Sequence, residues 1–242
     1  MSNSFFKEKF RLRISDFDCH DNLLISTILD LCQDVAGKHA DFLNVGYNKM
    51  ISEDKIWMIL RTKFEVIKKV PLYSTVVVKT WPNSPGRVDM DRDYLILSED
   101  EKELYVKVTS KWVVCSYSTR KLLRAKEAKF DLDYYLEEKN FNEPFDKIED
   151  FDLLNSKLEL TRTTYLDLDH NGHINNVKYG NFIINAIEDL QDKTIKRFQI
   201  DYKQELSKNV PVELRYIEKE KTFYIKGYSN NIESFVAKVV VE

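Results

Sequence analysis

The chain has 242 residues, with 37 basic and 40 acidic side chains and a formal net charge of −3. A hydrophobic content of 43% is enough for a sizeable core, so the composition excludes wholesale disorder. The near-neutral charge argues against a nucleic-acid-binding protein, which usually carries a strong basic excess. The longest apolar runs, such as residues 76–78, are far shorter than the ~20 residues that span a bilayer, so no membrane insertion is expected.

The beginning of the chain, MSNSFFKEKFRLRI, alternates charged and apolar residues and has no apolar stretch of the kind found in signal peptides. The three cysteines, Cys19, Cys32 and Cys115, are scattered and odd in number. They therefore predict neither a disulfide framework nor a zinc site. These features together predict a cytoplasmic protein.

A long helix is predicted over residues 22–46, because apolar side chains recur there at steps of three and four. From residue 57 to 124 the pattern changes to β-branched and aromatic stretches separated by turn residues, which is typical of strands. The clearest of these stretches are residues 76–81, 94–97 and 104–115. One long helix followed by several strands predicts an α+β unit in which the helix packs against an antiparallel sheet.

Residues 125–155 are rich in Asp and Glu and show no strand-like alternation, which predicts a linker with one short helix. The first pattern then returns, with a helix predicted over residues 174–190. Strand-like stretches flank that helix at residues 158–162, 198–202, 212–217, 222–228 and 234–241. The predicted organisation is therefore a first domain at 1–124, a linker at 125–155 and a second domain at 156–242.

The two halves share two further features. An acidic segment precedes each predicted helix, DFDCHDNL at residues 16–23 and DLDHNGHI at residues 167–174. After each helix, residues 63–71 (KFEVIKKVP) and 203–211 (KQELSKNVP) match at Lys, Glu, Lys, Val and Pro. An internal repeat indicates a duplicated fold unit, so two copies of helix and sheet are expected to pair into one pseudo-symmetric body.

A calcium site is one hypothesis for residues 167–178, because Asp167, Asp169 and Asn171 fall at the first ligand positions of an EF-hand loop. The last position of that loop, however, is Lys178 instead of the bidentate Glu, and the preceding residues alternate like a strand. His170 and His173 lack a third ligand at a defined spacing. Metal binding is therefore disfavoured, although a non-enzymatic calcium module remains an alternative.

The same segment suits acyl chemistry. Asp169, Asn171 and His173 stand just ahead of the predicted helix, with Asn175 and Asn176 in its first turn. Free N–H groups at a helix start can stabilise a carbonyl oxygen that gains negative charge, and a carboxylate and an imidazole can orient or deprotonate water. The alternative is that Asp169 and Asn171 merely cap the helix while His173 packs beneath it. Glu205 alone, between two lysines, is typical of a solvated face.

The segment DLDHNGHINNVKYGNF resembles the signature of acyl-acyl carrier protein thioesterases, whose pattern is Asp-x-Asn-x-His followed by Asn-Asn-Val-Lys-Tyr. Residues 202–205 (YKQE) resemble a second family segment, although Gln204 departs from its second basic residue. Residues 79–81 with 91–94, and 110–114, resemble a third segment. The similarity extends in order from about Phe10 to the C-terminus, and the family is built from two hotdog units in one chain.

The resemblance implies a tandem (double) hotdog of the α+β class that releases free fatty acid from acyl-acyl carrier protein and needs no cofactor. It maps the catalytic set onto Asp169, Asn171, His173 and Glu205. In plant members a cysteine follows the Glu, but Leu206 stands here, so a thiolate mechanism is disfavoured. Glu205 and Asp169 would activate a water, or one carboxylate would attack directly. His173 and Asn171 would orient the thioester and stabilise the oxyanion.

The matching positions of the first half are Asp18, His20, Asn22 and Glu65, with Asn and His exchanged. We therefore expect one active site per chain and an inactive relic in the first half. The acyl pocket is expected in the first half, where the helix is richer in apolar residues. Its expected substrate-binding residues, including those near the catalytic motif, are Cys32, Ala36, Met58, Asn175 and Asn176.

The expected partner is an acidic acyl carrier protein carrying a fatty acyl chain, and such a protein would be attracted by basic surface. Two clusters supply positive charge, Arg120, Lys121, Arg124, Lys126 and Lys129 in one and Lys193, Lys196 and Arg197 in the other. Two other activities stay open, an acyl-coenzyme A thioesterase and a hotdog dehydratase. The sequence also leaves open a homodimer and the preferred acyl chain length.

Overall fold

A computed structural model describes residues 4–128 and 134–242 of the chain. Its centre is a ten-stranded antiparallel sheet with the order β1-β3-β4-β5-β2-β7-β10-β9-β8-β6. The first five strands along the chain are β1 (Phe6–Arg11), β2 (Lys55–Val66), β3 (Thr75–Pro82), β4 (Asp89–Ser98) and β5 (Leu104–Ser116). The other five are β6 (Lys157–Arg162), β7 (Ile195–Tyr202), β8 (Pro211–Lys219), β9 (Thr222–Ser229) and β10 (Ile232–Val241).

Most of the described helices are short, and α1 is the long one. The α-helices are α1 (Ile25–Phe42), α2 (Tyr47–Ser52), α3 (Ala125–Ala128), α4 (Lys178–Ala186) and α5 (Glu188–Gln191). The described residues also include the 3₁₀ turns η1 (Ile14–Asp16), η3 (Leu153–Asn155) and η4 (Tyr165–Asp167). Among the described residues, no helix has the length and apolar character that crossing a membrane would require.

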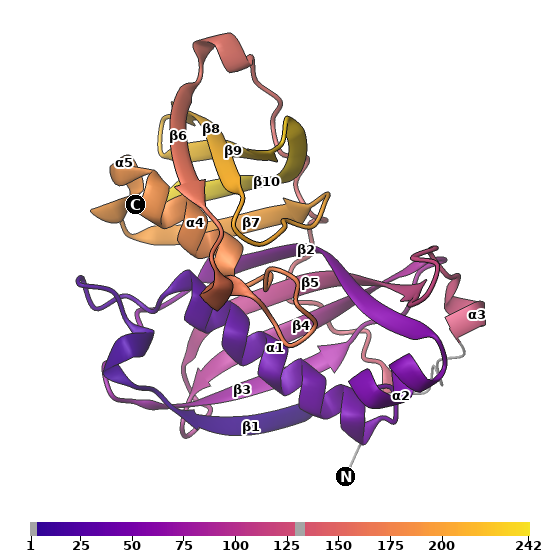
Figure 1. Cartoon of the computed structure of the whole chain (residues 1–242). Coiled ribbons are helices and arrows are strands. Elements are labelled where there is room, and N and C mark those ends of the chain that lie inside the picture. The colour runs from indigo at the N-terminus through magenta and orange to yellow at the C-terminus, as the bar shows by residue number, and fades with distance from the viewer. Residues whose placement is uncertain (1–3, 129–133) are drawn as a thin grey trace.

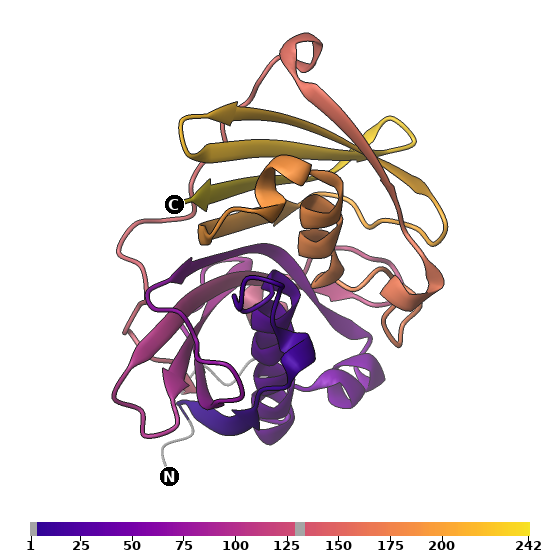
Figure 2. The same ribbon diagram turned by 90° about the vertical axis from the view of Figure 1, so that its left-hand side faces the viewer.

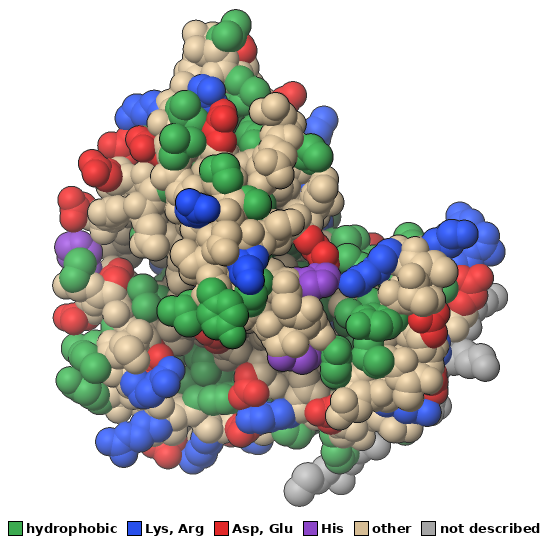
Figure 3. All heavy atoms as spheres, viewed as in Figure 1, with side chains coloured by type: hydrophobic (Ala, Val, Ile, Leu, Met, Phe, Trp, Pro, Cys, Tyr) green, Lys and Arg blue, Asp and Glu red, His purple; other side chains and the backbone are tan. Residues whose placement is uncertain are grey.

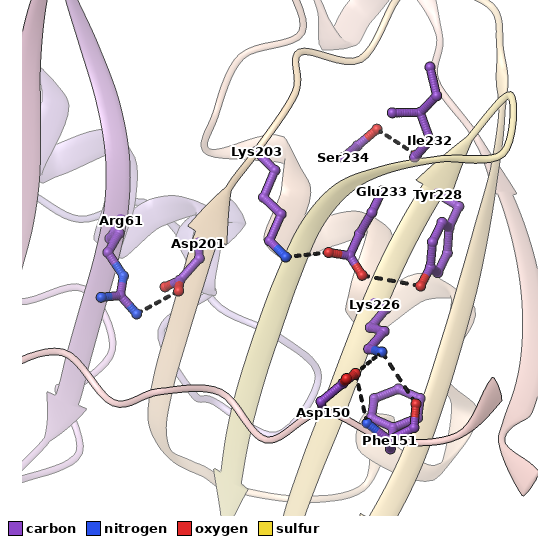
Figure 4. Close-up of polar contacts among 10 residues, drawn as sticks. All are labelled: Arg61, Asp150, Phe151, Asp201, Lys203, Lys226, Tyr228, Ile232, Glu233 and Ser234. Carbon is purple, nitrogen blue, oxygen red and sulfur yellow. Dashed lines mark hydrogen bonds and ion pairs between the residues drawn. The ribbon is translucent and has the colours of Figure 1, made fainter.

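The sheet consists of two units with one topology. In each unit the order is first, third, fourth, fifth and second strand, and the two second strands, β2 and β7, pair at the centre. This seam runs from the pair Arg61 and Asp201 to the pair Glu65 and Arg197. The guanidinium of Arg61 also binds the Asp201 carboxylate at 2.5 Å across the seam (Figure 4). The duplicated, pseudo-symmetric body expected from the repeat is therefore present.

The helices cover one face of the sheet. Figure 1 shows α1 in front of the strands of the first unit and α4 and α5 in front of those of the second, and Figure 2 shows the two units stacked. Where α1 meets α4, a Cβ on Gly180 would lie 2.6 Å from Cγ2 of Ile25. A residue without a side chain is therefore needed for the two helices to approach each other this closely.

Helix α1 is the long helix predicted from the sequence, although it is shorter at both ends than residues 22–46. Its apolar face is buried against the sheet, with Ile28 and Val35 almost fully enclosed. The helix ends at Phe42, because Asn44 takes a left-handed conformation (φ 59°) and its backbone N–H turns back to the carbonyl of Asp41. Gly46, the last residue of the predicted helix, lies after this reversal and precedes α2.

The second long helix, predicted over residues 174–190, is wrong in length. Only residues 178–186 form α4, and α5 follows after Ile187, whose φ of −98° and ψ of 90° interrupt the helix. Residues 174–177 form a bridge and a turn before α4, so Asn175 and Asn176 precede the helix instead of forming its first turn. The second unit therefore has a short, broken helix where the first has a continuous one.

The sequence match between residues 63–71 and 203–211 has the wrong register. The N–H groups of Ile67 and Lys68 both donate to the carbonyl of Tyr105, at 2.8 and 3.2 Å. In the second unit those of Lys203 and Gln204 both donate to the carbonyl of Ser234, at 2.9 and 3.0 Å. Ile67 therefore corresponds to Lys203, and the structural counterpart of Glu205 is Lys69, not Glu65.

The connection between the units is ordered against the sheet face opposite the helices, and we call residues 134–152 the strap. The indole N–H of Trp81 on β3 donates to the carbonyl of Glu138 at 2.9 Å. At the other end the Lys226 ammonium on β9 binds the Asp150 carboxylate and donates to the carbonyl of Phe151 at 3.3 Å (Figure 4). The strap thus crosses from the first unit to the second.

Candidate active site

The turn at residues 169–173 is held by one carboxylate. Oδ1 of Asp169 accepts hydrogen bonds from the backbone N–H groups of Asn171 (2.8 Å) and His173 (3.0 Å). The N–H of Asp169 donates to the carbonyl of His173 at 2.7 Å, which closes the turn. Gly172 has φ +79°, a conformation that favours glycine. Asp169 therefore fixes the turn that carries the other two motif residues, and it does not cap α4.

His173 and Glu205 meet although 32 residues of sequence separate them. Nδ1 of His173 lies 2.8 Å from Oε2 of Glu205, and their side chains are 32% and 54% exposed. Glu205 comes from the segment after β7, where buried Leu206 donates its N–H to the Tyr179 hydroxyl at 3.2 Å. Burial raises the pKa of Tyr179 to about 12, so the phenol stays protonated. The imidazole and carboxylate thus share a partly solvated site.

Asn171 is held by the first unit. The hydroxyl of Tyr47, at the start of α2, donates to Oδ1 of Asn171 at 2.6 Å. The Tyr47 ring also packs edge-on against His170, with centroids 4.7 Å apart. Because the amide oxygen is already engaged, the Nδ2 amino group is the end of Asn171 that can donate to a substrate. Tyr47 was not among the residues expected from the sequence. Nothing in the sequence around Tyr47 connects it to a residue 124 positions away.

A small apolar cavity of about 30 Å³ lies where the motif continues toward α4, at Asn176 and Val177. It is enclosed by α1, β2, β4 and β5 of the first unit and by the end of the motif and β7 of the second. The hydroxyl of Tyr202 donates to the carbonyl of Asn176 at 3.1 Å and closes one side. The residues that line it are Leu29, Cys32, Gln33, Ile59, Thr62, Tyr94, Val108, Ser110, Trp112, Asn176, Val177 and Tyr202.

The structure divides the expected substrate-binding residues. Cys32 and Asn176 line the cavity. Ala36 is buried in the main core one helical turn further along α1. Met58 pairs with Val113, and because strand side chains alternate, it points to the sheet face opposite that of the cavity-lining Ile59. Met58 therefore does not line this cavity.

Asn175 lies beside the cavity without lining it. Its side-chain oxygen accepts a hydrogen bond from the backbone N–H of Val177 at 3.2 Å, which shapes the turn into α4. Two of the three cysteines, Cys32 and Cys115, are buried. Burial raises the pKa of the Cys32 thiol and that of the Cys115 thiol, so both remain protonated near neutral pH. Neither of these two thiols is therefore suited to act as a thiolate nucleophile.

The first unit has the same turn with different side chains. Oδ1 of Asp18 accepts from the N–H groups of His20 (2.9 Å) and Asn22 (2.8 Å), and the Asp18 N–H donates to the Asn22 carbonyl at 2.9 Å. Asn22 thus stands where His173 stands in the second unit. Lys69, the counterpart of Glu205, donates from Nζ to the His20 carbonyl at 2.8 Å. This turn therefore has no counterpart of the His173–Glu205 pair, and its His20 imidazole lies 3.4 Å from the exposed carboxylate of Asp192 instead.

Glu65, which the sequence comparison aligned with Glu205, has a structural role elsewhere. Its carboxylate binds Lys107 at 3.0 Å and Arg197 at 2.8 Å on the face that carries the strap. Burial opposes its ionisation, but these two cations hold the pKa of the Glu65 carboxyl below its usual range. Glu65 links β2 to β5 and β7.

The calcium hypothesis is not supported by the geometry. Oδ2 of Asp167 accepts from the Thr164 N–H (2.6 Å) and hydroxyl (2.8 Å), so it closes a 3₁₀ turn instead of facing the Asp169 turn. Within residues 4–128 and 134–242 no group of three or more His, Cys, Asp or Glu side chains is arranged to hold a metal ion.

Two family models cover most of the chain. The acyl-ACP thioesterase N-terminal domain matches residues 3–131, and the acyl-ACP thioesterase C-terminal domain matches residues 153–236. The chain belongs to the acyl-ACP thioesterase family. The Asp-x-Asn-x-His turn falls within the second matched region, and strands of both units fall within the matches. This agrees with the resemblance noted from the sequence.

Two curated relatives of the chain are plant proteins. The oleoyl-acyl carrier protein thioesterase of Coriandrum sativum, described as chloroplastic, is 29% identical over 222 residues, which are 83% of this chain and 59% of that protein. The chloroplastic oleoyl-acyl carrier protein thioesterase 2 of Arabidopsis thaliana is 30% identical over 226 residues, with the same coverage. The chain thus spans about 59% of the length of these curated relatives.

Solved acyl-ACP thioesterases share the fold. An acyl-ACP thioesterase from Bacteroides thetaiotaomicron superposes with a TM-score of 0.86 at 22% identity and covers 100% of both chains. The 12:0-ACP thioesterase from Umbellularia californica superposes with a TM-score of 0.87 at 18% identity, covering 98% of this chain and 97% of the other. The hotdog-type fold expected from the sequence is therefore confirmed, with the shortened second helix as the departure.

Proposed function

We propose that the protein hydrolyses the thioester of acyl-acyl carrier protein and releases a free fatty acid. The observation that carries the proposal is the 2.8 Å contact between His173 Nδ1 and Glu205 Oε2 in a chain of the acyl-ACP thioesterase family. An imidazole held by a carboxylate is the arrangement that general-base catalysis needs. In the first unit Asn22 and Lys69 stand at the positions of His173 and Glu205, which supports one active site per chain.

The contact with Glu205 determines which nitrogen of His173 acts as the base. With Nδ1–H donating to the carboxylate, Nε2 keeps its lone pair and can take a proton from water. The water oxygen then attacks the thioester carbonyl carbon while its proton moves to Nε2. When the tetrahedral intermediate collapses, the C–S bond breaks and the imidazolium returns the proton to the leaving sulfur. The products are a carboxylic acid and the thiol of the carrier.

Asn171 and Asp169 take different parts in this mechanism. The amino group of Asn171, oriented by Tyr47, is available to donate to the oxyanion of the intermediate. Asp169 holds the turn through two backbone N–H groups. We therefore assign Asp169 a positioning role instead of the water activation expected from the sequence. Glu205, in turn, has the role of orienting the His173 imidazole.

We further propose that the first unit (1–124) supplies the acyl pocket and the second (156–242) the acid–base pair, with 125–155 between them. The apolar cavity at Cys32 and Asn176 supports this division, because its walls come mainly from α1 and the first-unit strands. At about 30 Å³ it would have to open to admit a fatty acyl chain.

The acyl carrier protein would dock on a basic surface. Arg120, Lys121 and Arg124 are exposed after β5, whereas Lys129 of the same predicted cluster lies outside the described residues. Of the second cluster, Arg197 is paired with Glu65 and Lys196 lies 3.5 Å from Glu242, so less charge is free there. Figure 3 shows basic side chains gathered at the edge where α3 lies in Figure 1. We therefore favour the first cluster.

A thiol-release assay tests the proposal with matched acyl chains on acyl carrier protein and on coenzyme A. We expect a higher kcat/KM on the carrier-protein thioester, and a KM for it that rises as salt exceeds ~0.15 M, where the Debye length is about 8 Å. Preference for coenzyme A would indicate the acyl-CoA thioesterase. An enoyl product without thiol release would indicate a dehydratase.

Two expectations remain predictions. The cytoplasmic location is one of them, and the curated relatives named above are chloroplastic. The homodimer is the other, and sedimentation of the purified chain would test it.

A further inference from the structure

A second cavity, of about 730 Å³, lies between the two units on the side of the first-unit turn. Figure 3 shows the helix-bearing face hollowed near its left edge, where the units meet. Its interior is apolar, and its mouth carries charged groups of both signs. The apolar residues are Leu23, Leu24, Ile25, Ile28, Phe64, Val66, Ile67, Val70, Val106, Ile184, Leu190 and Ile195.

This cavity is the pseudo-symmetric counterpart of the one beside the proposed active site. Since Ile67 corresponds to Lys203, the lining residue Ile59 of the small cavity corresponds to Ile195 of the large one. By the same relation Tyr202 of the small cavity corresponds to Val66 of the large one. The large cavity therefore occupies the position that an acyl pocket would have in a second, equivalent active site.

The large cavity owes its size to the short second helix. In the small cavity the wall is α1, a continuous helix of 18 residues. In the large cavity the corresponding wall is α4 and α5, with 9 and 4 residues and a break at Ile187. The volume of about 730 Å³ lies within the roughly 300–1,000 Å³ typical of small-molecule sites.

One charged group at the mouth of the cavity, the ammonium of Lys69, favours the binding of an anion. In the described part of the chain Lys69 forms no ion pair, and its ammonium donates to the carbonyl of His20 at 2.8 Å. The acids of the mouth already have partners. Asp18 accepts the turn N–H groups, Asp192 lies 3.4 Å from His20, and Glu242 lies 3.5 Å from Lys196. Lys69 is thus a lysine at the mouth without a carboxylate partner.

We propose that this cavity is a second lipid site that binds a long-chain aliphatic carboxylate without hydrolysing anything. The alkyl chain would lie against Ile25, Ile28 and Leu190, and the carboxylate would bind the ammonium of Lys69. Lys69 and Asn22 replace the Glu and His of the proposed active site, and the His20 imidazole at this mouth lies 3.4 Å from Asp192, so the His173–Glu205 pair has no counterpart here. A free carboxylate matches the Lys69 charge, whereas a neutral thioester or ester does not. The inference does not depend on the proposed hydrolysis.

Photoaffinity labelling of the full chain tests this site. The probe is a dodecanoate that carries a diazirine on its alkyl chain, and labelled peptides are mapped by mass spectrometry. We expect labels within residues 23–28 or 184–195, the two walls of the large cavity. Labels confined to residues 29–33 and 176–177, or absent from both regions, would overturn the inference and leave the proposed hydrolysis untouched.

A charge reversal sharpens the same experiment. Lys69→Glu is expected to weaken the labelling of the large cavity about tenfold, because a carboxylate would face a carboxylate. Lys102→Glu, an exposed lysine paired with Asp100 on the β4–β5 turn, is the matched control and should leave labelling unchanged. Thioester hydrolysis by both variants should stay within about twofold of wild type.

A second probe and a second variant cover the remaining outcomes. The methyl ester of the same diazirine probe should label the large cavity about tenfold less than the acid, and equal labelling would contradict the role of Lys69. Leu23→Trp, which adds bulk at a half-buried wall position, should abolish the label at 184–195 while circular dichroism stays unchanged. A persistent label in that folded variant would also overturn the inference.

Discussion

The turns at residues 16–24 and 167–175 share the same backbone hydrogen bonds but carry different side chains. In each turn an Asp accepts the N–H groups two and four residues later, and a single bridge closes it, Phe17 with Leu23 in one and Leu168 with Ile174 in the other. The second turn faces a carboxylate and the first a lysine. The duplicated fold thus supplies the turn, and a few side chains decide whether it suits the proposed hydrolysis.

The largest contrast is expected at the residue that faces each turn. Glu205→Gln should lower kcat by about 10²- to 10³-fold, because the amide cannot stabilise the imidazolium of His173. Lys69→Gln, which likewise neutralises the charged residue at the equivalent position, should keep kcat within about twofold. Steady-state thiol release measures both. A larger loss in Lys69→Gln than in Glu205→Gln would mean that the site has been assigned to the wrong half.

The two aspartates should separate stability from catalysis. Asp18→Ala and Asp169→Ala should each lower the free energy of unfolding by about 1–2 kcal/mol, the usual effect of removing a carboxylate that binds backbone N–H groups. Asp169→Ala should also lower kcat by roughly 10²-fold, since His173 and Asn171 lose their fixed turn. Urea unfolding and thiol release measure the two effects. Full activity in a destabilised Asp169→Ala protein would remove its positioning role.

Tyr47 tests the contribution of the first unit to the site. Tyr47→Phe should lower kcat about tenfold with little change in KM, because Asn171 then loses the bond that directs its amino group. Tyr73→Phe is the control, as Tyr73 is 62% exposed on a turn and lines neither cavity. If KM rises instead while kcat holds, Tyr47 acts on substrate binding and not on Asn171.

The smallest effects should come from the pocket wall. Cys32→Phe should shift the preference toward shorter acyl chains by several-fold per two carbons, since each buried methylene contributes ~0.8 kcal/mol. Ala36→Phe, one turn further along the same helix, should shift it in the same direction. Met58→Phe should leave the profile flat, because Met58 lies on the opposite sheet face. A flat profile for Cys32→Phe would place the acyl chain elsewhere.

Much of this fold follows from local patterns that the sequence displays. The spacing of apolar residues from Ile25 to Ala36 predicts α1, and the repeated Asp-rich turns predict the duplication. The register of the repeat could not be obtained in this way. Residues 63–71 match residues 203–211 at five positions by chance, and the true correspondence follows from strand pairing, which only the structure shows. The second helix was overestimated, since its apolar spacing continues through Ile187 although its backbone does not.

The site was predicted in part. The four residues expected to act together lie on one turn and on the segment after β7, and the pair of His173 and Glu205 is in contact. Tyr47 and the strap contacts depend on long-range packing, which leaves no local trace in the sequence. Lys69 likewise becomes meaningful only when the two turns are superposed.

His173 in the second turn and Asn22 in the first occupy equivalent positions. Exchanging them tests most directly the central claim that the second turn alone forms the active site. His173→Asn gives the second turn the residue of the first, and Asn22→His does the reverse. Thiol release from acyl-acyl carrier protein should fall at least 10²-fold in His173→Asn and stay within about twofold of wild type in Asn22→His. More than half of wild-type turnover in a folded His173→Asn protein would contradict the account.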